Sequence, residues 1–454
     1  EIVPRDWSSD VCSSDLEKIK MKYYLIGIKG SGMSTLAQIL YDLGYEVSGY
    51  DDNTDYKFTE EGLIKRHIPI YHDGKNKLSS NTIVTYSAAF KETHHEIQRV
   101  KALGLQIKKY HEILGDLTRK FNSICVCGTH GKTTTSTLIT HVLKNTLGCN
   151  YFIGDGTGHA SLDNNLFVIE SCEFNRHFLS YEPTYTVLTN IELEHTETYQ
   201  NLEDIISAFQ AFASKTKKKI IACGDDENIR KLELTQEVIY YGLNDNNDVV
   251  AKNIDYSSKN TTFDCYIKNK FAGRITIPLY GKHMVLNTLA CVAMLMELNI
   301  PFANITTLLK TFQNAKRRFH EEQVKDTIII DDYAHHPTEI AATINAARQK
   351  YPAKTIVAVF KPNTYSRTKD FYHDFATQLN KADITYLTEV ESNRETAKEY
   401  PGVTSKLIFD ELTNGHMLTD DNINELTNIP NAVILFLSCA STSHLIEKFQ
   451  KLKK

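Results

Sequence analysis

The sequence lacks an excess of basic residues, a long apolar run and closely paired cysteines. Its 51 Lys and Arg residues stand against 56 Asp and Glu residues, so the formal net charge is -5, which excludes a strongly basic nucleic-acid-binding protein. The longest apolar stretch, residues 286–300, is interrupted by Asn287, Glu297 and Asn299 and falls short of the ~20 residues that cross a bilayer. The nine cysteines form no C-x-x-C pair, which favours free thiols in a reducing compartment. We therefore expect a cytoplasmic protein without a nucleic-acid partner and without membrane insertion.

The first twenty residues differ from the remainder of the chain. They hold the only tryptophan, Trp7, and a near-repeat in which Ser8-Ser9-Asp10 is followed by Ser13-Ser14-Asp15. No basic stretch followed by an apolar one marks a signal peptide. The segment resembles a translated cloning or assembly scar with Met21 as the natural start, and the alternative is a genuine disordered extension. We therefore exclude residues 1–20 from the fold assignment.

From Met21 onward, short apolar strands alternate with helical segments, which is typical of α/β domains with largely parallel sheets. The pattern starts three times, near residues 22, 122 and 327. In the second unit, strand-like segments alternate with turn residues over residues 248–278. This pattern predicts antiparallel strands at the edge of the second sheet. At about 150 residues per domain, this predicts three α/β domains, over residues 21–118, 119–313 and 314–454.

The strongest local motif lies between a predicted strand at 124–127 and a predicted helix at 133–143. It reads Gly-Thr-His-Gly-Lys-Thr-Thr over residues 128–134. Such a loop turns successive backbone N–H groups toward a phosphate, while the lysine neutralises β/γ-phosphate charge and a hydroxyl coordinates Mg²⁺. Val126 breaks the strict G-x-x-x-x-G-K-[ST] pattern, so we predict a shortened phosphate loop. The alternative is a glycine-rich turn without function.

A second glycine loop, residues 27–32, follows the first predicted strand, and Asp51-Asp52 ends the next one. This arrangement resembles a dinucleotide fingerprint, but Lys29 occupies the place of the second glycine in G-x-G-x-x-G. Because that glycine admits the pyrophosphate, ordinary NAD binding is disfavoured and a Rossmann oxidoreductase becomes the weaker alternative. We expect a diphosphate at the helix N-terminus with Lys29 nearby.

Carboxylates and histidines follow several other predicted strands, in residues 170–173, 190–195, 331–337 and 360–368. Ligands of open α/β sheets bind beyond the carboxyl ends of the strands. The first two clusters therefore suit Mg²⁺ bridged to phosphate oxygens, and ordinary polar loops are the alternative for all four. The adjacent His335 and His336 point in different directions, so we expect no zinc site at this pair.

Taken in order, these motifs resemble the Mur ligase family, which builds the peptide of bacterial cell-wall precursors. The resemblance spans essentially everything from Met21 onward. It implies an α/β three-domain architecture: a Rossmann-like N-terminal domain, a P-loop central ATP-binding domain and a Rossmann-like C-terminal ligase domain. The residues that carry it are Gly30-Ser31-Gly32-Met33-Ser34, Gly128-Thr129-His130-Gly131-Lys132-Thr133-Thr134-Thr135, Asn190-Ile191-Glu192 with His195, Asp331 to Glu339, and Tyr365-Ser366-Arg367-Thr368.

The resemblance also implies roles for individual residues. Those implied to bind the UDP-linked substrate and the amino acid are Gly30, Ser31, Gly32, Met33, Ser34, Asp51, Ser87, Asn190, Tyr333, His335 and Arg367. Those implied to bind ATP are Gly128, Thr129, His130, Gly131, Lys132, Thr133, Thr134, His283, Asn287, Arg318 and Asp332. Those implied to bind Mg²⁺ are Thr133, Glu173 and His195, and those implied to act in catalysis are Lys132, Glu173, His195 and Arg367.

Within the family, the His130 form of the loop resembles the ligases that join L-alanine to UDP-N-acetylmuramate through an acyl phosphate. The resemblance implies ATP and Mg²⁺ as cofactors and a monomer or homodimer. Two alternatives are a ligase that recycles a ready-made tripeptide and a paralogue that binds ATP without chemistry. An active enzyme is expected despite departures from the usual family residues at Lys29, Cys172, Glu194, Met284, Lys361, Asn363 and residues 438–441.

Overall fold

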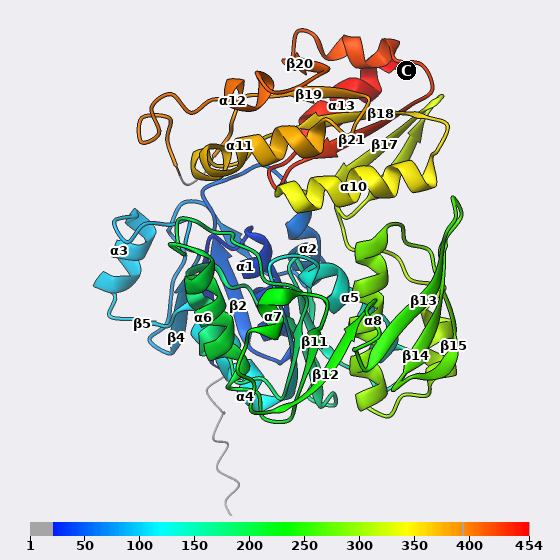
Figure 1. The fold of residues 1–454 in the computed structure, drawn as a ribbon. Coiled ribbons are helices and arrows are strands. Elements are labelled where there is room, and N and C mark those ends of the chain that lie inside the picture. Colours follow the sequence, from blue (N-terminus) through cyan, green and yellow to red (C-terminus); the bar gives the residue numbers. More distant parts are fainter. Residues whose placement is uncertain (1–20, 393–394, 454) are drawn as a thin grey trace, which may run out of the picture.

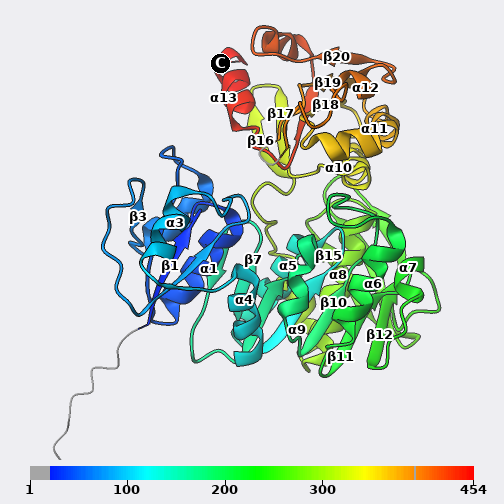
Figure 2. The same cartoon turned by 90° about the vertical axis from the view of Figure 1, so that its left-hand side faces the viewer.

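The computed structural model describes residues 21–392 and 395–453, so the hypothesis about residues 1–20 lies outside the described residues. The chain forms three sheets with helices packed on them. Figure 1 shows the third sheet and its helices, coloured yellow to red, above the other two. Figure 2 shows the first sheet in blue beside the second in green. The predicted three-part α/β architecture is confirmed.

The first sheet has five parallel strands in the order β3-β2-β1-β4-β5. Its central strand β1 and helix α1 flank the first glycine loop, as the apolar spacing of α1 predicts. The bounds are β1 (Lys22–Ile26), α1 (Ser31–Asp42), β2 (Glu46–Tyr50), η1 (Phe58–Glu60), α2 (Glu61–Lys65), β3 (Ile70–Tyr71), β4 (Thr82–Tyr86), α3 (His95–Ala102), β5 (Gln106–Ile107) and α4 (Tyr110–Lys120).

The second sheet has ten strands in the order β15-β14-β13-β12-β11-β10-β6-β9-β7-β8. Strands β13 to β15 pair antiparallel at one edge, which confirms the expectation for residues 248–278. The bounds are β6 (Asn122–Cys127), α5 (Lys132–Lys144), β7 (Asn150–Ile153), β8 (Thr157–His159), β9 (Leu166–Glu170), η2 (Phe174–Ser180), β10 (Tyr185–Leu188), α6 (Leu202–Ala213), β11 (Lys219–Cys223), α7 (Glu227–Arg230), β12 (Glu237–Gly242), β13 (Val249–Tyr256), β14 (Thr261–Ile267), β15 (Lys270–Ile277), α8 (Lys282–Glu297) and α9 (Phe302–Leu309).

The third sheet has six strands in the order β16-β17-β21-β18-β19-β20, and only its edge strand β16 runs antiparallel to its neighbour. The pattern that starts near residue 327 predicts a strand at 327–332, a helix at 337–350 and a strand at 355–360, and these coincide with β17, α10 and β18. The bounds are β16 (His320–Val324), β17 (Thr327–Asp332), α10 (Pro337–Lys350), β18 (Thr355–Phe360), α11 (Tyr365–Leu379), β19 (Ile384–Leu387), α12 (Lys406–Phe409), β20 (Gly415–Met417), η3 (Ile423–Asn428), β21 (Ala432–Leu437) and α13 (Ser443–Lys453).

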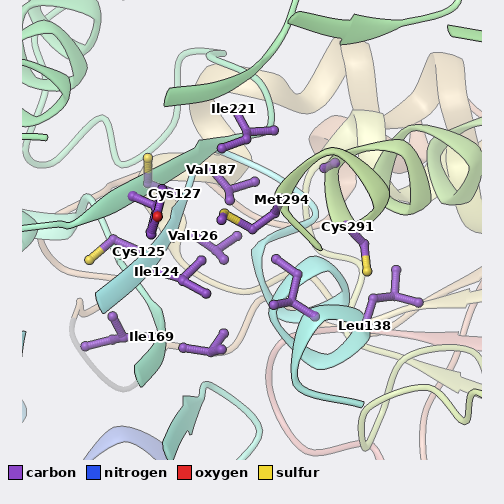
Figure 3. Packing of buried hydrophobic residues seen from close by; sticks show 14 of the residues in the cluster. Ile124, Cys125, Val126, Cys127, Leu138, Ile169, Val187, Ile221, Cys291 and Met294 are labelled. Carbon is purple, nitrogen blue, oxygen red and sulfur yellow. The ribbon is translucent and has the colours of Figure 1, made fainter. Parts of the chain in front are cut away.

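Strand β6, which leads into the phosphate loop, is buried on both faces of the second sheet. Its side chains alternate between the faces, and Ile124, Cys125, Val126 and Cys127 are all fully buried. Figure 3 shows Val126 near Met294 of α8, and Ile124 and Leu138 of α5 belong to the same apolar cluster. Continuous apolar strands are characteristic of parallel sheets covered on both sides. The loop is therefore built on a rigid base.

The first and second sheets share one apolar cluster, which helix α1 extends from the first sheet to β7 and β8. Polar contacts cross the same boundary, because Gln38 Nε2 donates to Gly156 O at 2.8 Å and Arg66 donates to Gly158 O at 3.0 Å. Among the described residues, no helix is long and apolar enough to span a membrane.

Lys29 takes a different place from the one expected near a diphosphate. Its side chain is 2% exposed, and Nζ pairs with Glu60 at 3.0 Å and donates to Asp55 O at 3.1 Å. The backbone N–H of Lys29 donates to Asp51. The lysine therefore fastens the glycine loop to residues 55–60 and turns its charge into the protein.

We predict that Glu60→Ala destabilises the first sheet strongly. Removing one partner leaves the buried Lys29 charge unpaired, which costs about 3–5 kcal/mol. Hydrogen exchange of the β1 and β2 amides measures this loss. The matched control is Glu46→Ala, because the Lys22–Glu46 pair has exposed side chains (35% and 59%) and exposed pairs contribute about 0–1 kcal/mol. Equal effects of the two substitutions would contradict the prediction.

Candidate active site

The phosphate loop lies between β6 and α5, and its two glycines adopt backbone angles that other residues rarely take. Gly128 has φ of 132° and Gly131 has φ of 82°. A side chain at Gly128 would collide with Thr189, and one at Gly131 would stand 2.6 Å from the amide oxygen of Asn287. Asn190 fixes the turn between them, since its amide accepts from His130 N at 2.8 Å and donates to His130 O at 3.0 Å.

Lys132 begins α5 and folds back over the loop. Its Nζ donates to Gly128 O at 2.6 Å and to Thr129 O at 2.8 Å, and it lies 3.0 Å from Glu173 Oε2. Burial opposes its charge, but Glu173 holds the pKa of Lys132 above its ordinary value. A phosphate that enters the loop therefore replaces contacts that the lysine already makes.

Two sets of carboxylate side chains lie beside the loop: Glu170 in the first, and Glu173 and Glu194 in the second. Thr133 Oγ1 donates to Glu170 at 2.9 Å and accepts from Arg318 at 3.3 Å. Glu173, Glu194 and His195 each offer a ligand atom within 4.8 Å of the others.

The Glu173–Glu194–His195 group fits a divalent cation. His195 Nε2 lies 3.7 Å from Glu173 Oε1, and its other ring nitrogen, Nδ1, lies 3.6 Å from Glu197 Oε1. The backbone of His195 has φ of 53°, a strained conformation of the kind that gathers at functional sites. Carboxylate oxygens are the ligands that Mg²⁺ prefers, so the donor set of Glu173, Glu194 and His195 suits this ion.

The third domain brings two cations to Glu194. His335 Nε2 lies 3.3 Å from Glu194 Oε1 and Arg367 donates to the same oxygen at 3.1 Å. Burial opposes ionisation, yet His335, His195 and Arg367 hold the pKa of Glu194 well below its ordinary value. Tyr333 meets His335 edge to face, with ring centroids 5.4 Å apart. The site therefore presents two cations that a substrate carboxylate can share.

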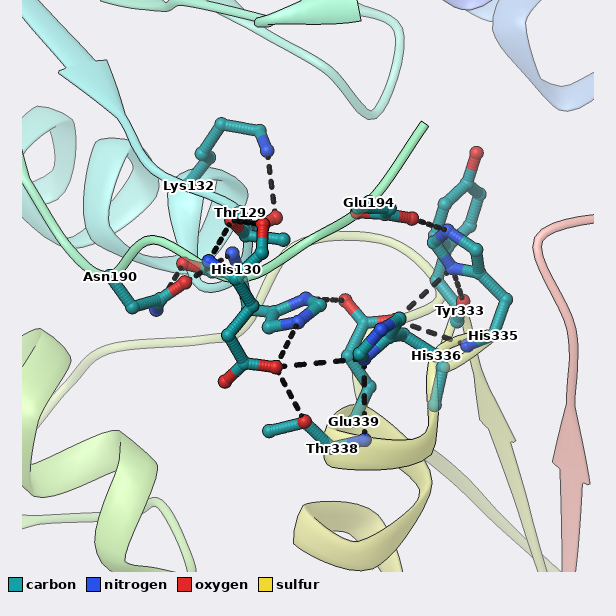
Figure 4. A network of polar contacts seen from close by, with 12 residues as sticks. Thr129, His130, Lys132, Asn190, Glu194, Tyr333, His335, His336, Thr338 and Glu339 are labelled. Carbon is teal, nitrogen blue, oxygen red and sulfur yellow. Dashed lines mark hydrogen bonds and ion pairs between the residues drawn. The ribbon is translucent and has the colours of Figure 1, made fainter. Parts of the chain in front are cut away.

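A further set of contacts joins His130 of the loop to helix α10, as Figure 4 shows. His130 lies 3.4 Å from both Glu192 and Glu339, and the Thr338 hydroxyl donates to Glu192 at 2.7 Å. Burial opposes protonation, but Glu192 and Glu339 raise the pKa of His130 to about 9. His336 caps α10 and faces His130.

A cavity of about 340 Å³ opens at the boundary between the second and third domains. His283, Met284, Arg318 and Asp332 line it, together with the aromatic rings of Tyr280, Phe312 and Phe319. Burial lowers the pKa of His283 to about 4, so its ring is neutral at pH 7. Asn287 lies at the phosphate loop instead, against Gly131. The cavity has the mixed aromatic and polar lining of a small-molecule site.

The residues expected to hold the UDP-linked substrate gather at the carboxyl edge of the first sheet. Ser87 follows β4 and packs on Gly27, and Asp51 follows β2 and accepts from the backbone of Lys29 and Asn53. Met33 and Ser34 are buried, and the Ser34 hydroxyl donates to Thr59 O. The N–H groups of Gly30 and Ser34 are taken by Gly27 O and Gly30 O, which leaves the main-chain N–H groups of residues 31–33 at the α1 N-terminus for a ligand.

No individual role could be assigned from the sequence to three polar residues of the site, Thr338, Glu339 and Glu192. Thr338 and Glu339 belong to the 331–339 segment, but no phosphate motif marks them. Glu192 was grouped with the carboxylates that follow β10, without a partner. The signal available was the capping pattern at Pro337, which predicts a helix N-terminus pointing at the site.

Fold and site together define a three-domain α/β protein in which a phosphate loop faces a third domain across a carboxylate-lined cleft. Three family models match consecutive parts of the chain: the "Mur ligase family, catalytic domain" at residues 22–122, the "Mur ligase middle domain" at 126–295, and the "Mur ligase, glutamate ligase domain" at 317–445. The chain belongs to the Mur ligase family. Members are ATP-dependent ligases of acids with amino acids, acting in peptidoglycan synthesis on UDP-linked sugar substrates.

Solved structures of this family resemble the chain along most of its length. The UDP-N-acetylmuramate-alanine ligase of Thermotoga maritima is 25% identical, with 95% of this chain and 98% of that chain covered and a TM-score of 0.79. A murein peptide ligase of Psychrobacter arcticus is 21% identical, with the same coverage and a TM-score of 0.74. The MurF ligase of Thermotoga maritima, solved in complex with ADP, is 18% identical over 82% of this chain and 90% of that chain, with a TM-score of 0.63.

We predict that Gly128→Ala weakens ADP binding by about tenfold or more. The new side chain collides with Thr189 at a positive φ, and strain of about 1–3 kcal/mol per residue corresponds to roughly a 5- to 150-fold change in affinity. Titration with a fluorescent ADP analogue measures the change. Gly44→Ala is the control, since Gly44 has φ of 91° but no described atom within 4 Å of the added carbon. Unchanged ADP affinity in Gly128→Ala would contradict the prediction.

Proposed function

We propose that this chain joins L-alanine to the carboxylate of UDP-N-acetylmuramate at the expense of ATP. The observation that carries the proposal is the convergence of His335 and Arg367 on one oxygen of Glu194, close to Glu173 and its partner Lys132. Two cations thus lie near Lys132, which supports a role for His335 and Arg367 in binding a carboxylate and for Lys132 in binding phosphate. The 25% identity to an alanine-adding ligase along 95% of the chain supports the same substrates.

ATP would lie between the second and third domains. Residues 128–134 would hold its phosphates, with Lys132 at the β/γ positions. The adenosine would occupy the 340 Å³ cavity, beside His283, Arg318 and Asp332. Asn287, which touches the loop at Gly131, would support the phosphates rather than reach the adenine.

The UDP-linked substrate would bind along the carboxyl edge of the first sheet. Within the loop of residues 30–34, the main-chain N–H groups of residues 31–33 would receive its diphosphate, while Asp51 and Ser87 would line the pocket. Asn190 would act indirectly, since both ends of its amide are engaged by His130. We propose domains over residues 21–118, 119–313 and 314–454, with the UDP part, ATP and the amino acid assigned to them in that order.

Thr133, Glu173 and His195 would hold Mg²⁺, with Glu170 and Glu194 as further carboxylates close by. When bound, the ion supplies positive charge that stabilises the phosphoryl oxygens. A carboxylate is a poor electrophile and must first be activated. One of its oxygens takes the γ-phosphoryl group, ADP leaves, and an acyl phosphate results.

The neutral amine of alanine then attacks the carbonyl carbon of the acyl phosphate, and the tetrahedral intermediate expels phosphate. Lys132 stabilises the negative charge that develops on the transferred group. Arg367 and His335 hold the carboxylate of alanine and so orient its amine. The third domain excludes water, which would otherwise hydrolyse the acyl phosphate.

The test is ADP release with ATP, Mg²⁺ and UDP-N-acetylmuramate in the presence of L-alanine, glycine, L-serine or the L-Ala-D-Glu-containing tripeptide. We expect strong stimulation by L-alanine and little by the other acceptors. Stimulation by the tripeptide alone would assign the recycling reaction instead. ATP binding without release in the presence of any acceptor would mean a binding-only paralogue.

We predict that Lys132→Ala lowers turnover by at least about 10²–10³-fold, as expected for the loss of one preorganised donor. The assay is steady-state ADP release with the best acceptor. Lys144→Ala is the matched control, because Lys144 is an exposed lysine at the other end of α5. Near-wild-type turnover in Lys132→Ala would overturn the assignment of the phosphate loop.

A further inference from the structure

His130 of the phosphate loop and His336 at the start of α10 face each other across the boundary between the second and third domains. Their ring centroids are 4.6 Å apart, and the residues are only 9% and 4% exposed. Glu192, from the loop after β10, lies beside both. One ligand atom from each residue lies within 4.8 Å of the other two. Three elements that are far apart in the sequence thus bring two imidazoles and a carboxylate to one point.

The spacing of these atoms suits a small divalent cation. His130 Nε2 lies 3.4 Å from Glu192 Oε2, and His336 Nδ1 lies 3.9 Å from the same oxygen. A tetrahedral cation with ligand bonds of ~2.0–2.2 Å holds its donor atoms roughly 3.4 Å apart. The three residues therefore need only small adjustments to bind one ion.

The ring nitrogens are held only by long contacts, since each nitrogen of His130 lies 3.4 Å from a carboxylate oxygen. Neither nitrogen of His130 makes a hydrogen bond to any described residue, although both are buried. His336 Nδ1 accepts only a long hydrogen bond of 3.4 Å from Thr338 N. This bond engages the lone pair of Nδ1, the nitrogen on the side of Glu192, so a cation bound there would replace the long capping contact of Thr338 N.

Thr338 and Glu339 contact the proposed ligands Glu192 and His130 and would hold them in place, as hydrogen-bond partners of metal ligands usually do. The Thr338 hydroxyl donates to Glu192 Oε2 at 2.7 Å, and Glu339 lies 3.4 Å from His130 Nδ1, the ring nitrogen opposite to the one that faces Glu192. Metal-binding histidines usually turn their second ring nitrogen to a carboxylate, which fixes the ring and raises its basicity. The alternative occupant of this space is a proton shared between His130 and the two glutamates.

We propose that His130, Glu192 and His336 form a transition-metal site, suited to Zn²⁺, which joins the phosphate loop to the third domain. Imidazole ligands favour Zn²⁺ and related ions, whereas Mg²⁺ prefers oxygen. The site is therefore chemically different from the Glu173–Glu194–His195 group. Because His336 belongs to the third domain and the other two ligands to the second, bound Zn²⁺ stabilises the arrangement in which these domains touch.

The expectation that His335 and His336 would not form a zinc pair agrees with this geometry. His335 turns to Glu194 at 3.3 Å, whereas His336 turns to His130. The partner of His336 comes from a loop about 200 residues earlier in the chain, so adjacency in sequence gave no signal of the site.

The experiment is a titration of the metal-free full-length protein with Zn²⁺ against a chromogenic zinc indicator, without nucleotide. We expect one tight site per chain. His336→Gln should weaken it by more than 100-fold, beyond the ~10–100-fold that an orienting partner is worth. Thr338→Val, which removes only the hydrogen bond to Glu192, should weaken it by about 10–100-fold.

The controls are His195→Gln and His94→Gln, because these histidines belong to the two other groups of potential metal ligands in the described structure, Glu173–Glu194–His195 and Asp52–His94–His95. Both variants should retain the tight site. Loss of the site in either one, with wild-type binding in His336→Gln, would overturn the proposal, as would the absence of any tight Zn²⁺ site.

A second measurement requires no variant and so does not depend on whether His336→Gln folds. Crystals of the wild-type protein soaked with Zn²⁺ should give an anomalous peak within bonding distance of His130, Glu192 and His336. A peak only at His195 or only at His94 would contradict the site.

Discussion

The contact of the phosphate loop with the third domain depends on carboxylates that pair with cations of both parts, and of these Glu194 is buried whereas Glu192 and Glu339 are partly exposed. Glu192 and Glu339 flank His130 of the loop, and Glu194 receives both His335 and Arg367. A buried charge without a partner is costly, so each of these groups must remain paired. Substrates that enter the cleft therefore exchange partners with groups already in place. Under the proposed function, phosphate would displace Glu173 from Lys132, and a substrate carboxylate would displace Glu194 from Arg367.

The polar contacts join the second and third domains, whereas the apolar contacts join the first and second sheets. The first two sheets share a single apolar cluster, whereas the clusters of the third domain, as far as the chain is described, draw only on residues after 318. Packed apolar interfaces resist sliding, while polar interfaces between domains permit rotation. The third domain is thus the part expected to move, and its polar boundary is where ATP and the amino acid would enter.

The fold could be read from the sequence wherever the apolar pattern was strong, as at β17, α10 and β18, because buried parallel strands and capped helices leave clear local signals. Helix α11 was missed since Tyr365 to Thr368 had the composition of a loop, although Arg367 lies in its first turn. The phosphate loop was found because its chemistry is local. The partners of His130 were not, because Glu192, His336 and Glu339 reach it only through the arrangement of separate elements.

The motif around Lys29 does not reveal that the charged end of this lysine points into the protein. A lysine beside a predicted diphosphate site suggests a phosphate ligand, yet its side chain is buried against Glu60 and Asp55 O. The glycine it replaces would leave that interior space empty, so the lysine here fills volume and anchors residues 55–60 to the loop. Lys316, which precedes the strained backbone of Arg317 and Phe319, pairs with Glu61 next to this segment at 2.6 Å. The contact that anchors the first glycine loop and the contact made by Lys316 before the third domain therefore lie at the neighbouring residues Glu60 and Glu61.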